Sequence, residues 1–237
     1  MIRAINHKYI SVSPCCCLQF DFIMTLNVIK LIVIETANST YLANFINVNK
    51  IMALKPTTCK EAIARWEKLK GEVAAEATVI ELQFQWPPIE KMDGALSTLV
   101  ACEKLSLSSN MIDKIAGIAG MRSLKILSLG RNYIKSLSGI ETVADTLEEL
   151  WISYNPIDKL KGVGALKNLR VLYMSNNMIK EWVEFNRLQE CTSLRDLVFI
   201  GNPLCDNQPD VDTWRTQASN RLQQITKLDG IPIVRET

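Results

Sequence analysis

The amino-acid sequence predicts an α/β solenoid, in which short strands lie side by side and each is followed by a helical return segment. The segment CEKLSLSSNMIDKI, which begins at Cys102, recurs in register as LKILSLGRNYIKSL, LEELWISYNPIDKL, LRVLYMSNNMIKEW and LRDLVFIGNPL. Apolar residues at helix-like spacing separate the copies. A repeat of this length cannot bury its apolar face alone, so the copies must stack. Their asparagines return at spacings of 22, 23, 22 and 25 residues, at Asn110, Asn132, Asn155, Asn177 and Asn202.

The recurring motif matches the pattern L-x-x-L-x-L-x-x-N-x-L of leucine-rich repeats, at the short end of their range of roughly 20–29 residues. An imperfect copy, VIELQFQWPPIEKM from Val79, precedes the others and places Pro87 in the asparagine position. With this copy, the sequence predicts about six repeats over residues 79–204.

Each position of the repeat has an expected physical role. Side chains of a strand alternate between its two faces, so Leu150 and Ile152 in the third copy should both point inward. Ile157, after the turn, should fill the core beside them. The asparagine side chain is expected to bond to backbone groups of the turn between neighbouring coils. Its loss would leave buried polar atoms unpaired, at about 1–3 kcal/mol each.

A helical cap is expected before the repeats, because the first coil has no neighbour on one side. Residues 52–78 are expected to form this cap. Its helix begins at Thr58, where Thr58-Cys-Lys-Glu61 has the spacing of a capping box, and it ends at Gly71. The apolar face of the helix is expected to consist of Ala62, Ile63, Trp66 and Leu69.

A second cap is expected after the last repeat, over residues 205–237. It contains a helix from about Val211 to Gln224 and the closing segment LDGIPIV. Three tryptophans outside the strands are expected to pack in the core or the caps, namely Trp66, Trp86 and Trp182.

Residues 1–51 differ in composition from the rest of the chain. Their apolar stretch at 18–34 contains Asp21 and Lys30, which makes it a poor membrane span. Because the composition changes abruptly at Met52, we expect Met52 to be the initiator and residues 1–51 to be an unmatched extension that arises from the gene model. A genuine lineage-specific anchor is the alternative.

Catalysis and metal binding that depend on imidazole are disfavoured, because the sequence contains 1 histidine, His7. Ser-His-Asp and Cys-His catalysis and most zinc sites need histidine. The 7 cysteines form no C-x-x-C pair, which favours free thiols. Lysine and arginine number 27 against 25 acidic residues, so no charge excess favours a nucleic-acid or membrane partner. We therefore expect a non-enzyme without cofactor or metal.

One face of the predicted sheet carries an apolar stripe that the repeat itself does not bury. Trp151, Tyr173 and Val198 stand at its centre, on the concave side of the solenoid. An exposed aromatic patch with a polar rim is typical of a protein-binding site. Coverage by loops or by residues 1–51 is the alternative. The expected site, including rim positions, consists of Ile126, Ser128, Arg131, Glu149, Trp151, Tyr154, Val171, Tyr173, Val198 and Ile200.

Residues 52–237 also resemble the leucine-rich-repeat light chains of axonemal outer-arm dynein. These belong to a short-repeat class that includes phosphatase-regulating and spliceosomal proteins. Residues 205–217 depart from the light-chain pattern, and residues 1–51 have no counterpart in it. The resemblance rests on segments whose non-leucine positions match as well: EAIARW, PPIEKMD, CEKLSLSSN, LSLGRN, DTLEELWISYN, LYMSNN, DLVFIGNPL and KLDGIPIV.

The resemblance implies a non-catalytic subunit in the cytoplasm, on the axonemal cytoskeleton of cilia and flagella. Such a subunit binds an outer-arm dynein heavy chain at its motor region near the microtubule-binding stalk tip, contacts the doublet microtubule and regulates beating. By carry-over, Trp151, Tyr173 and Val198 would meet the heavy chain. A polar rim or the C-terminal helix, with Arg215 and Arg221, would approach the acidic tubulin surface. A regulatory scaffold of the phosphatase-binding type, which would use the same face, is the alternative.

Overall fold

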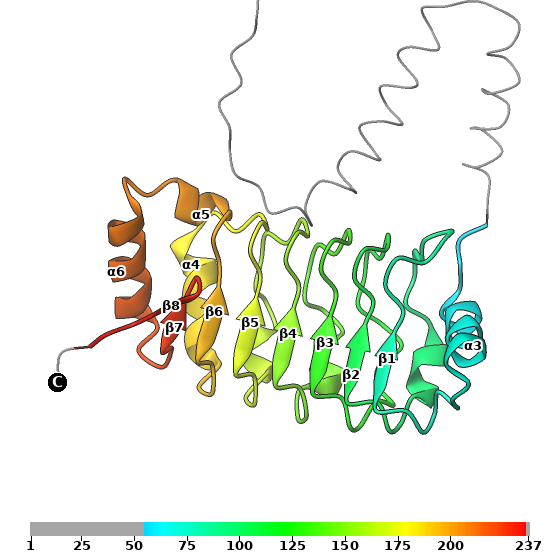
Figure 1. Ribbon diagram of the computed structural model, residues 1–237. Helices are drawn as coiled ribbons and strands as arrows, with labels where there is room; N and C mark the ends of the chain where they lie inside the picture. The colour runs from blue at the N-terminus through cyan, green and yellow to red at the C-terminus, as the bar shows by residue number, and fades with distance from the viewer. Residues whose placement is uncertain (1–54, 236–237) are drawn as a thin grey trace, which may run out of the picture. The chain divides into compact units, whose positions relative to one another are not determined.

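The computed structural model describes residues 55–235, which form an eight-stranded sheet whose strands follow one another in chain order (Figure 1). The residues before 55, including the proposed initiator Met52, lie outside the described part. The stacked strands and their returns confirm the predicted α/β solenoid. Strands from successive repeats pair in parallel, in the order β1 (Val79–Glu81), β2 (Lys104–Ser106), β3 (Ile126–Ser128), β4 (Glu149–Trp151), β5 (Val171–Tyr173) and β6 (Asp196–Val198).

Short helical turns carry the chain from one strand back to the start of the next. A repeat of 22 or 23 residues leaves room for little more than one turn, which favours the tighter 3₁₀ geometry. The longer step from β5 to β6 also admits a turn of α-helix, α4 (Trp182–Phe185). The 3₁₀ turns are η1 (Gly94–Thr98), η2 (Ile140–Val143), η3 (Val163–Ala165) and η4 (Asn186–Glu190).

The core lies between the sheet and these return segments. The middle residue of each repeat strand and the apolar residue two positions later are buried, as Leu150 and Ile152 are in the coil of β4. Ile157 closes the same coil from the other side of the turn and is also buried. The core is therefore a continuous column of aliphatic side chains, one layer from each coil.

Buried asparagines join each coil to the next. Asn155 donates through Nδ2 to the carbonyl oxygens of Leu129 (3.0 Å) in the preceding coil and Ile152 (3.1 Å) in its own. Its Oδ1 accepts the N–H of Ile134 at 3.0 Å. Each asparagine thus satisfies three buried backbone groups that no strand partner reaches. The same three bonds recur at Asn110, Asn132, Asn177 and Asn202.

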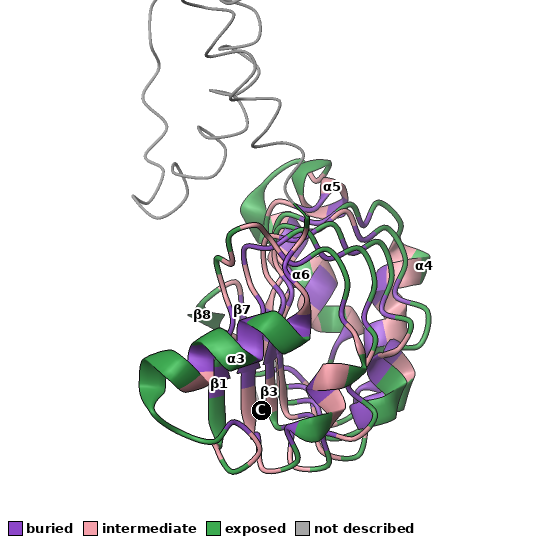
Figure 2. Cartoon of the chain, turned by 90° about the vertical axis from the view of Figure 1, so that its right-hand side faces the viewer, coloured by how far each residue is buried: buried purple, intermediate pink, exposed green. Residues whose placement is uncertain are grey.

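The N-terminal cap is the helix α3 (Cys59–Lys70), which begins with the predicted capping box at Thr58 and ends at Gly71 in the left-handed conformation. Figure 2 shows its exposed outer side and the buried residues on its inner side. The prediction for Leu69 is wrong, because this side chain is 82% exposed. Leu69 lies at the margin of the buried stripe, which consists of Cys59, Ala62, Ile63 and Trp66.

The first coil departs from the predicted register. Strand pairing aligns Ile80 with Leu105, so the inward pair of this coil is Ile80 and Leu82. Phe84 is consequently exposed. Gln85, and not Pro87, takes the asparagine position. Asn110 of the next coil accepts the N–H of Ile89, which lies four residues after Gln85, whereas in the later coils the bonded residue lies two after the asparagine. The first turn therefore has two extra residues. Trp86, which was expected to be packed, lies in this longer turn and is 56% exposed.

The C-terminal cap supplies the bonds that a further coil would make. In an inner coil, Met174 donates its N–H to a carbonyl group of the next strand. Its counterpart Phe199 donates instead to Oδ1 of Asp229 at 2.6 Å, and Ile200 donates to the same atom at 3.0 Å. The other oxygen of Asp229 accepts Nε1 of Trp214 at 2.9 Å. One carboxylate thus closes the last repeat and holds the cap helix.

Two further strands follow from this cap, β7 (Lys227–Leu228) and β8 (Ile231–Pro232). β7 adds to β6 in parallel, and β8 returns antiparallel to it. The turn between them is of two residues, Asp229 and Gly230, with φ of 50° and 81°, as a type I′ hairpin turn requires. The cap helices are α5 (Pro203–Asp206) and α6 (Val211–Arg221), and α6 ends three residues before the predicted Gln224.

Replacing one asparagine tests the role of these inter-coil bonds. Asn155→Ala removes one acceptor and two donor bonds in the core, so we expect the free energy of unfolding to fall by about 2–4 kcal/mol. Urea denaturation followed by circular dichroism measures this change. Asn220→Ala, an exposed substitution in α6, is the control and should change stability by less than about 0.5 kcal/mol. Equal losses in both variants would contradict the assigned role.

Candidate protein-binding face

The open face of the sheet is the side opposite the core, and it carries the first and third residue of each repeat strand. Parallel pairing places Ile126, Glu149 and Val171 in one column. Trp151 and Tyr173 lie side by side in the next column. Neighbouring strands are about 4.8 Å apart, so residues of successive repeats come into contact although roughly a repeat of sequence separates them.

Two aromatic rings form the centre of the open face. Trp151 and Tyr173 stack with their centroids 6.1 Å apart and their planes 16° from parallel. The ammonium of Lys104 lies 5.2 Å from the centroid of the Trp151 ring. Lys104 belongs to β2 and Tyr173 to β5, so they approach the Trp151 ring from opposite directions along the sheet.

Charged groups hold the polar ends of both rings. Trp151 donates its Nε1–H to Oε2 of Glu149 at 3.2 Å. Tyr173 donates its hydroxyl to Oδ2 of Asp196 at 3.3 Å, and Lys227 donates to the same oxygen at 2.9 Å. The stripe expected to be apolar therefore consists of two stacked aromatic rings with charged side chains on either side.

The protonation of this row follows from its contacts. Burial, and after it the negative charge of Asp196, raises the pKa of the Tyr173 hydroxyl above its usual value. The hydrogen bond to Asp196, and then the charge of this carboxylate, raises the pKa of Lys227. Both groups therefore keep their protons at neutral pH and remain donors to Asp196.

The remaining predicted residues occupy different depths. Ile126, Val171 and Val198 are half-buried on the open face. Ile200 is 55% exposed beside them. Ser128 is only 8% exposed and shares a 2.7 Å hydrogen bond with Ser108, so it offers a partner little surface.

Arg131 and Tyr154 lie at the edge of the open face. The guanidinium of Arg131 is 5.2 Å from the centroid of the Tyr154 ring, which is a cation–π geometry. Each directly precedes one of the buried turn asparagines. Their φ angles are 56° and 59°, a conformation unusual for bulky side chains. The next two turns place Asn176 and Gly201 there, which tolerate it better.

Sequence reasoning omitted three residues from this site. Lys104 and Asp196 stood in the same repeat column as Glu149, and that column was the signal that could have identified them. Lys227 gave no such signal, because the strand β7 that positions it is not part of a repeat.

The arginines suggested for a tubulin contact are largely committed to the cap. Arg215 donates to the carbonyl oxygens of Leu228 (2.7 Å) and, more weakly, Pro232 (3.3 Å), which fixes the β7–β8 hairpin to α6. Arg221 lies 3.9 Å above the Trp182 ring and donates to a carbonyl of its own helix. Their guanidinium groups therefore stabilise the C-terminal cap, which leaves less of each group available to bind tubulin.

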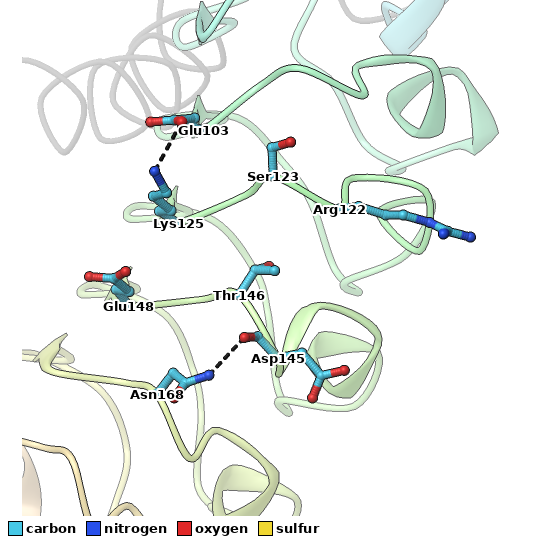
Figure 3. A pocket seen from close by; sticks show the side chains of 8 residues that line it. All are labelled: Glu103, Arg122, Ser123, Lys125, Asp145, Thr146, Glu148 and Asn168. Atoms are coloured by element: carbon cyan, nitrogen blue, oxygen red, sulfur yellow. Dashed lines mark hydrogen bonds and ion pairs between the residues drawn. The ribbon is translucent and has the colours of Figure 1, made fainter.

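A hollow of about 330 Å³ opens between coils, near the starts of the strands (Figure 3). Its charges are partly paired within the wall, as the 2.9 Å bond from Lys125 to Glu103 shows. Asn168 donates to the carbonyl of Asp145 across the same hollow at 2.7 Å. Acidic and basic groups alternate here, which is typical of a solvated face. Within residues 55–235, no group of three or more His, Cys, Asp or Glu could hold a metal ion.

The cysteines of the described part are unpaired thiols: Cys59, Cys102, Cys191 and Cys205. Burial raises the pKa of Cys205 to about 11 and that of Cys191 to about 12. At neutral pH these thiols are protonated and weakly nucleophilic. In the described part of the chain, no helix is long and apolar enough to cross a membrane.

The stacked short coils define a leucine-rich-repeat protein. Residues 145–186 match the family model described as Leucine Rich repeats (2 copies). Among solved structures, a leucine-rich-repeat protein of Leptospira interrogans is similar with a TM-score of 0.50 and 23% identity, over 62% of this chain and 36% of that one. The Drosophila melanogaster SNF/U2A′ complex gives a TM-score of 0.53 with 19% identity, over 62% and 87%. These likenesses show the fold.

Sequence relatives define the family more narrowly. Dynein axonemal light chain 1 of Danio rerio is 60% identical over 182 residues, which cover 77% of this chain and 95% of the relative. The Homo sapiens protein of the same name is 60% identical, over 76% and 95%. The Chlamydomonas reinhardtii protein is 52% identical, over 76% and 92%. This chain belongs to the axonemal dynein light chain 1 family.

Membership of this family indicates the functional class of the chain and its location in the cell. It is a non-catalytic light chain of an axonemal dynein. Its location is the axonemal cytoskeleton of cilia and flagella. The resemblance seen in the repeat sequences is thereby confirmed.

Thiol labelling tests the burial of the cysteines. Because the protonated thiol reacts slowly, we expect iodoacetamide at pH 8 to leave Cys59, Cys102 and Cys191 unmodified in the native protein. Half-exposed Cys205 should react slowly, and faster as the pH rises toward its pKa of about 11. Peptide mass spectrometry measures each site separately, and denaturant should release all four. Rapid native labelling of Cys191 would contradict the packing described.

Proposed function

We propose that this light chain binds the motor region of an outer-arm dynein heavy chain through the open face, contacts the microtubule and thereby regulates ciliary and flagellar motility. The observation that carries the proposal is the stacked pair Trp151 and Tyr173 at the centre of a sheet face that the repeats do not cover. Aromatic side chains of this kind dominate binding energy at protein interfaces.

The architecture supports a recognition role. In this solenoid the return segments cover one face of the parallel sheet and bury the core there. They do not cover the other face. The open face is left to present Val171, Val198 and Ile200 around the two rings. These apolar side chains have Glu149 and Asp196 as charged neighbours, which gives the mixture of an apolar centre and a polar rim that interfaces show.

The microtubule contact needs a surface of positive charge, because tubulin is acidic. A row of exposed lysines follows the asparagine turns, one from each of five coils, and none of them has an ion-pair partner within residues 55–235. Acidic residues stand beside several of these lysines, so the attraction is modest and depends on salt. The row consists of Lys91, Lys114, Lys135, Lys159 and Lys180.

The alternative function is a regulatory scaffold of the phosphatase-binding type that uses the same open face. The family to which the chain belongs favours the dynein partner. Identification of the captured protein separates the two proposals directly.

Truncation of both rings tests the proposed face. The full-length chain is immobilised and incubated with a high-salt extract of axonemes, and captured dynein heavy chain is identified by mass spectrometry. We expect the double variant Trp151→Ala with Tyr173→Ala to lose at least tenfold in capture, because hot-spot truncations each cost about 2 kcal/mol or more. Its thermal midpoint should fall by only a few degrees, because the lost stacking is worth about 1 kcal/mol.

The control is Tyr133→Ala, which truncates an exposed aromatic residue outside the open face and should capture heavy chain like the wild type. Capture of a phosphatase instead of a heavy chain by the wild-type chain would favour the scaffold. Unchanged heavy-chain capture by the double variant would exclude the open face as the contact.

A further inference from the structure

We infer that Glu149 and Asp196 are positioning residues of the open face, which fix the rings of Trp151 and Tyr173 in one arrangement before a partner binds. This inference rests on the proposed function, because it assigns roles within the same interface.

Glu149 holds the indole. It lies two residues before Trp151 on β4 and on the same face, so its carboxylate reaches the indole N–H at 3.2 Å. Within residues 55–235, Glu149 forms no ion pair. Among the described residues, its carboxylate accepts a hydrogen bond from Trp151 alone. Without this acceptor, the indole N–H would turn toward water.

Asp196 holds the phenol from the opposite side. It lies on β6, diagonally across from Tyr173 on β5, and accepts the hydroxyl at 3.3 Å. Lys227, from the cap strand β7, fixes the same carboxylate oxygen at 2.9 Å. The C-terminal cap thereby contributes to the arrangement of a ring two strands away.

Stacking completes the constraint. Each ring is held at its polar end by a carboxylate and on one side by the other ring, and Lys104 lies on the far side of Trp151. Immobilising a free side chain at an interface costs about 0.5–1.5 kcal/mol. Two rings that are already fixed avoid most of this cost, which strengthens binding without any added contact.

The same geometry defines the chemistry of the partner. Because Glu149 and Asp196 already accept the hydrogen bonds of both rings, a partner does not have to supply acceptors. The surface left to it is the apolar part of the rings, together with Val198 and the 55% exposed Ile200. The heavy-chain segment that lies here should therefore present aliphatic or aromatic side chains at the centre of the contact.

The test compares variants that keep or remove each anchor. Glu149→Ala removes the acceptor of the indole, whereas Glu149→Gln keeps an acceptor oxygen without the charge. Tyr173→Phe removes the bond to Asp196 and leaves the ring. The matched control Glu148→Ala deletes a neighbouring carboxylate that pairs with Arg170 at 3.9 Å and has no contact with the rings.

Two readouts are needed for these full-length variants. The amount of axoneme extract needed for half-maximal capture of heavy chain should rise roughly three- to tenfold in Glu149→Ala and in Tyr173→Phe. Glu149→Gln and Glu148→Ala should bind like the wild type. The indole N–H resonance of Trp151, assigned by its absence in Trp151→Phe, should shift and exchange faster with solvent in Glu149→Ala only.

The outcomes separate this inference from the proposed function. Wild-type affinity in Glu149→Ala, with a shifted indole resonance, would overturn the positioning role while leaving the open face as the contact. Weakening in Glu149→Gln equal to that in Glu149→Ala would show that the charge itself meets the partner. Wild-type affinity in Tyr173→Phe would overturn the role of Asp196. Failure of the proposed function appears elsewhere, as heavy-chain capture that survives loss of both rings.

Discussion

The buried asparagine of each turn is the constraint on which the rest of this molecule depends. Its amide satisfies three backbone groups that lie between coils, where neither strand pairing nor water reaches them. Because the bonds extend into the preceding coil, they fix the spacing and register of neighbouring strands together. Unsatisfied buried backbone groups are costly, so no other register is competitive. Every column of side chains on the sheet follows from this register.

The same constraint creates a problem at the two ends. A last strand has donors that would normally bond to the next coil, and here the carboxylate of Asp229 accepts two of them. At the other end, Cys59 of α3 donates its N–H to Asp93, which also caps η1, so the helix is tied to the first return segment. Both caps thus end the repeat by supplying hydrogen bonds as well as apolar cover.

The open face shows how a solenoid turns a linear repeat into a surface. A column brings together one residue from each coil, so four charged side chains from β2, β4, β6 and β7 lie around the two rings, namely Lys104, Glu149, Asp196 and Lys227. Their mutual contacts occupy the polar ends of both rings. A face that is arranged before its partner arrives loses less entropy on binding.

The class of fold, the six repeats, the inward residues of the five later coils and the capping box of α3 could be predicted from the amino-acid sequence, because each of these depends on short periods or local hydrogen bonds. The sequence also identified Trp151 and Tyr173 as face residues through the strand period of two. It misplaced the first coil, where two extra residues in the turn move Phe84 outward, since an insertion leaves the local apolar pattern intact. Only the tertiary structure placed Lys227 beside Asp196, and Asp229 under the last strand, because these pairs join a repeat to a cap that follows no period.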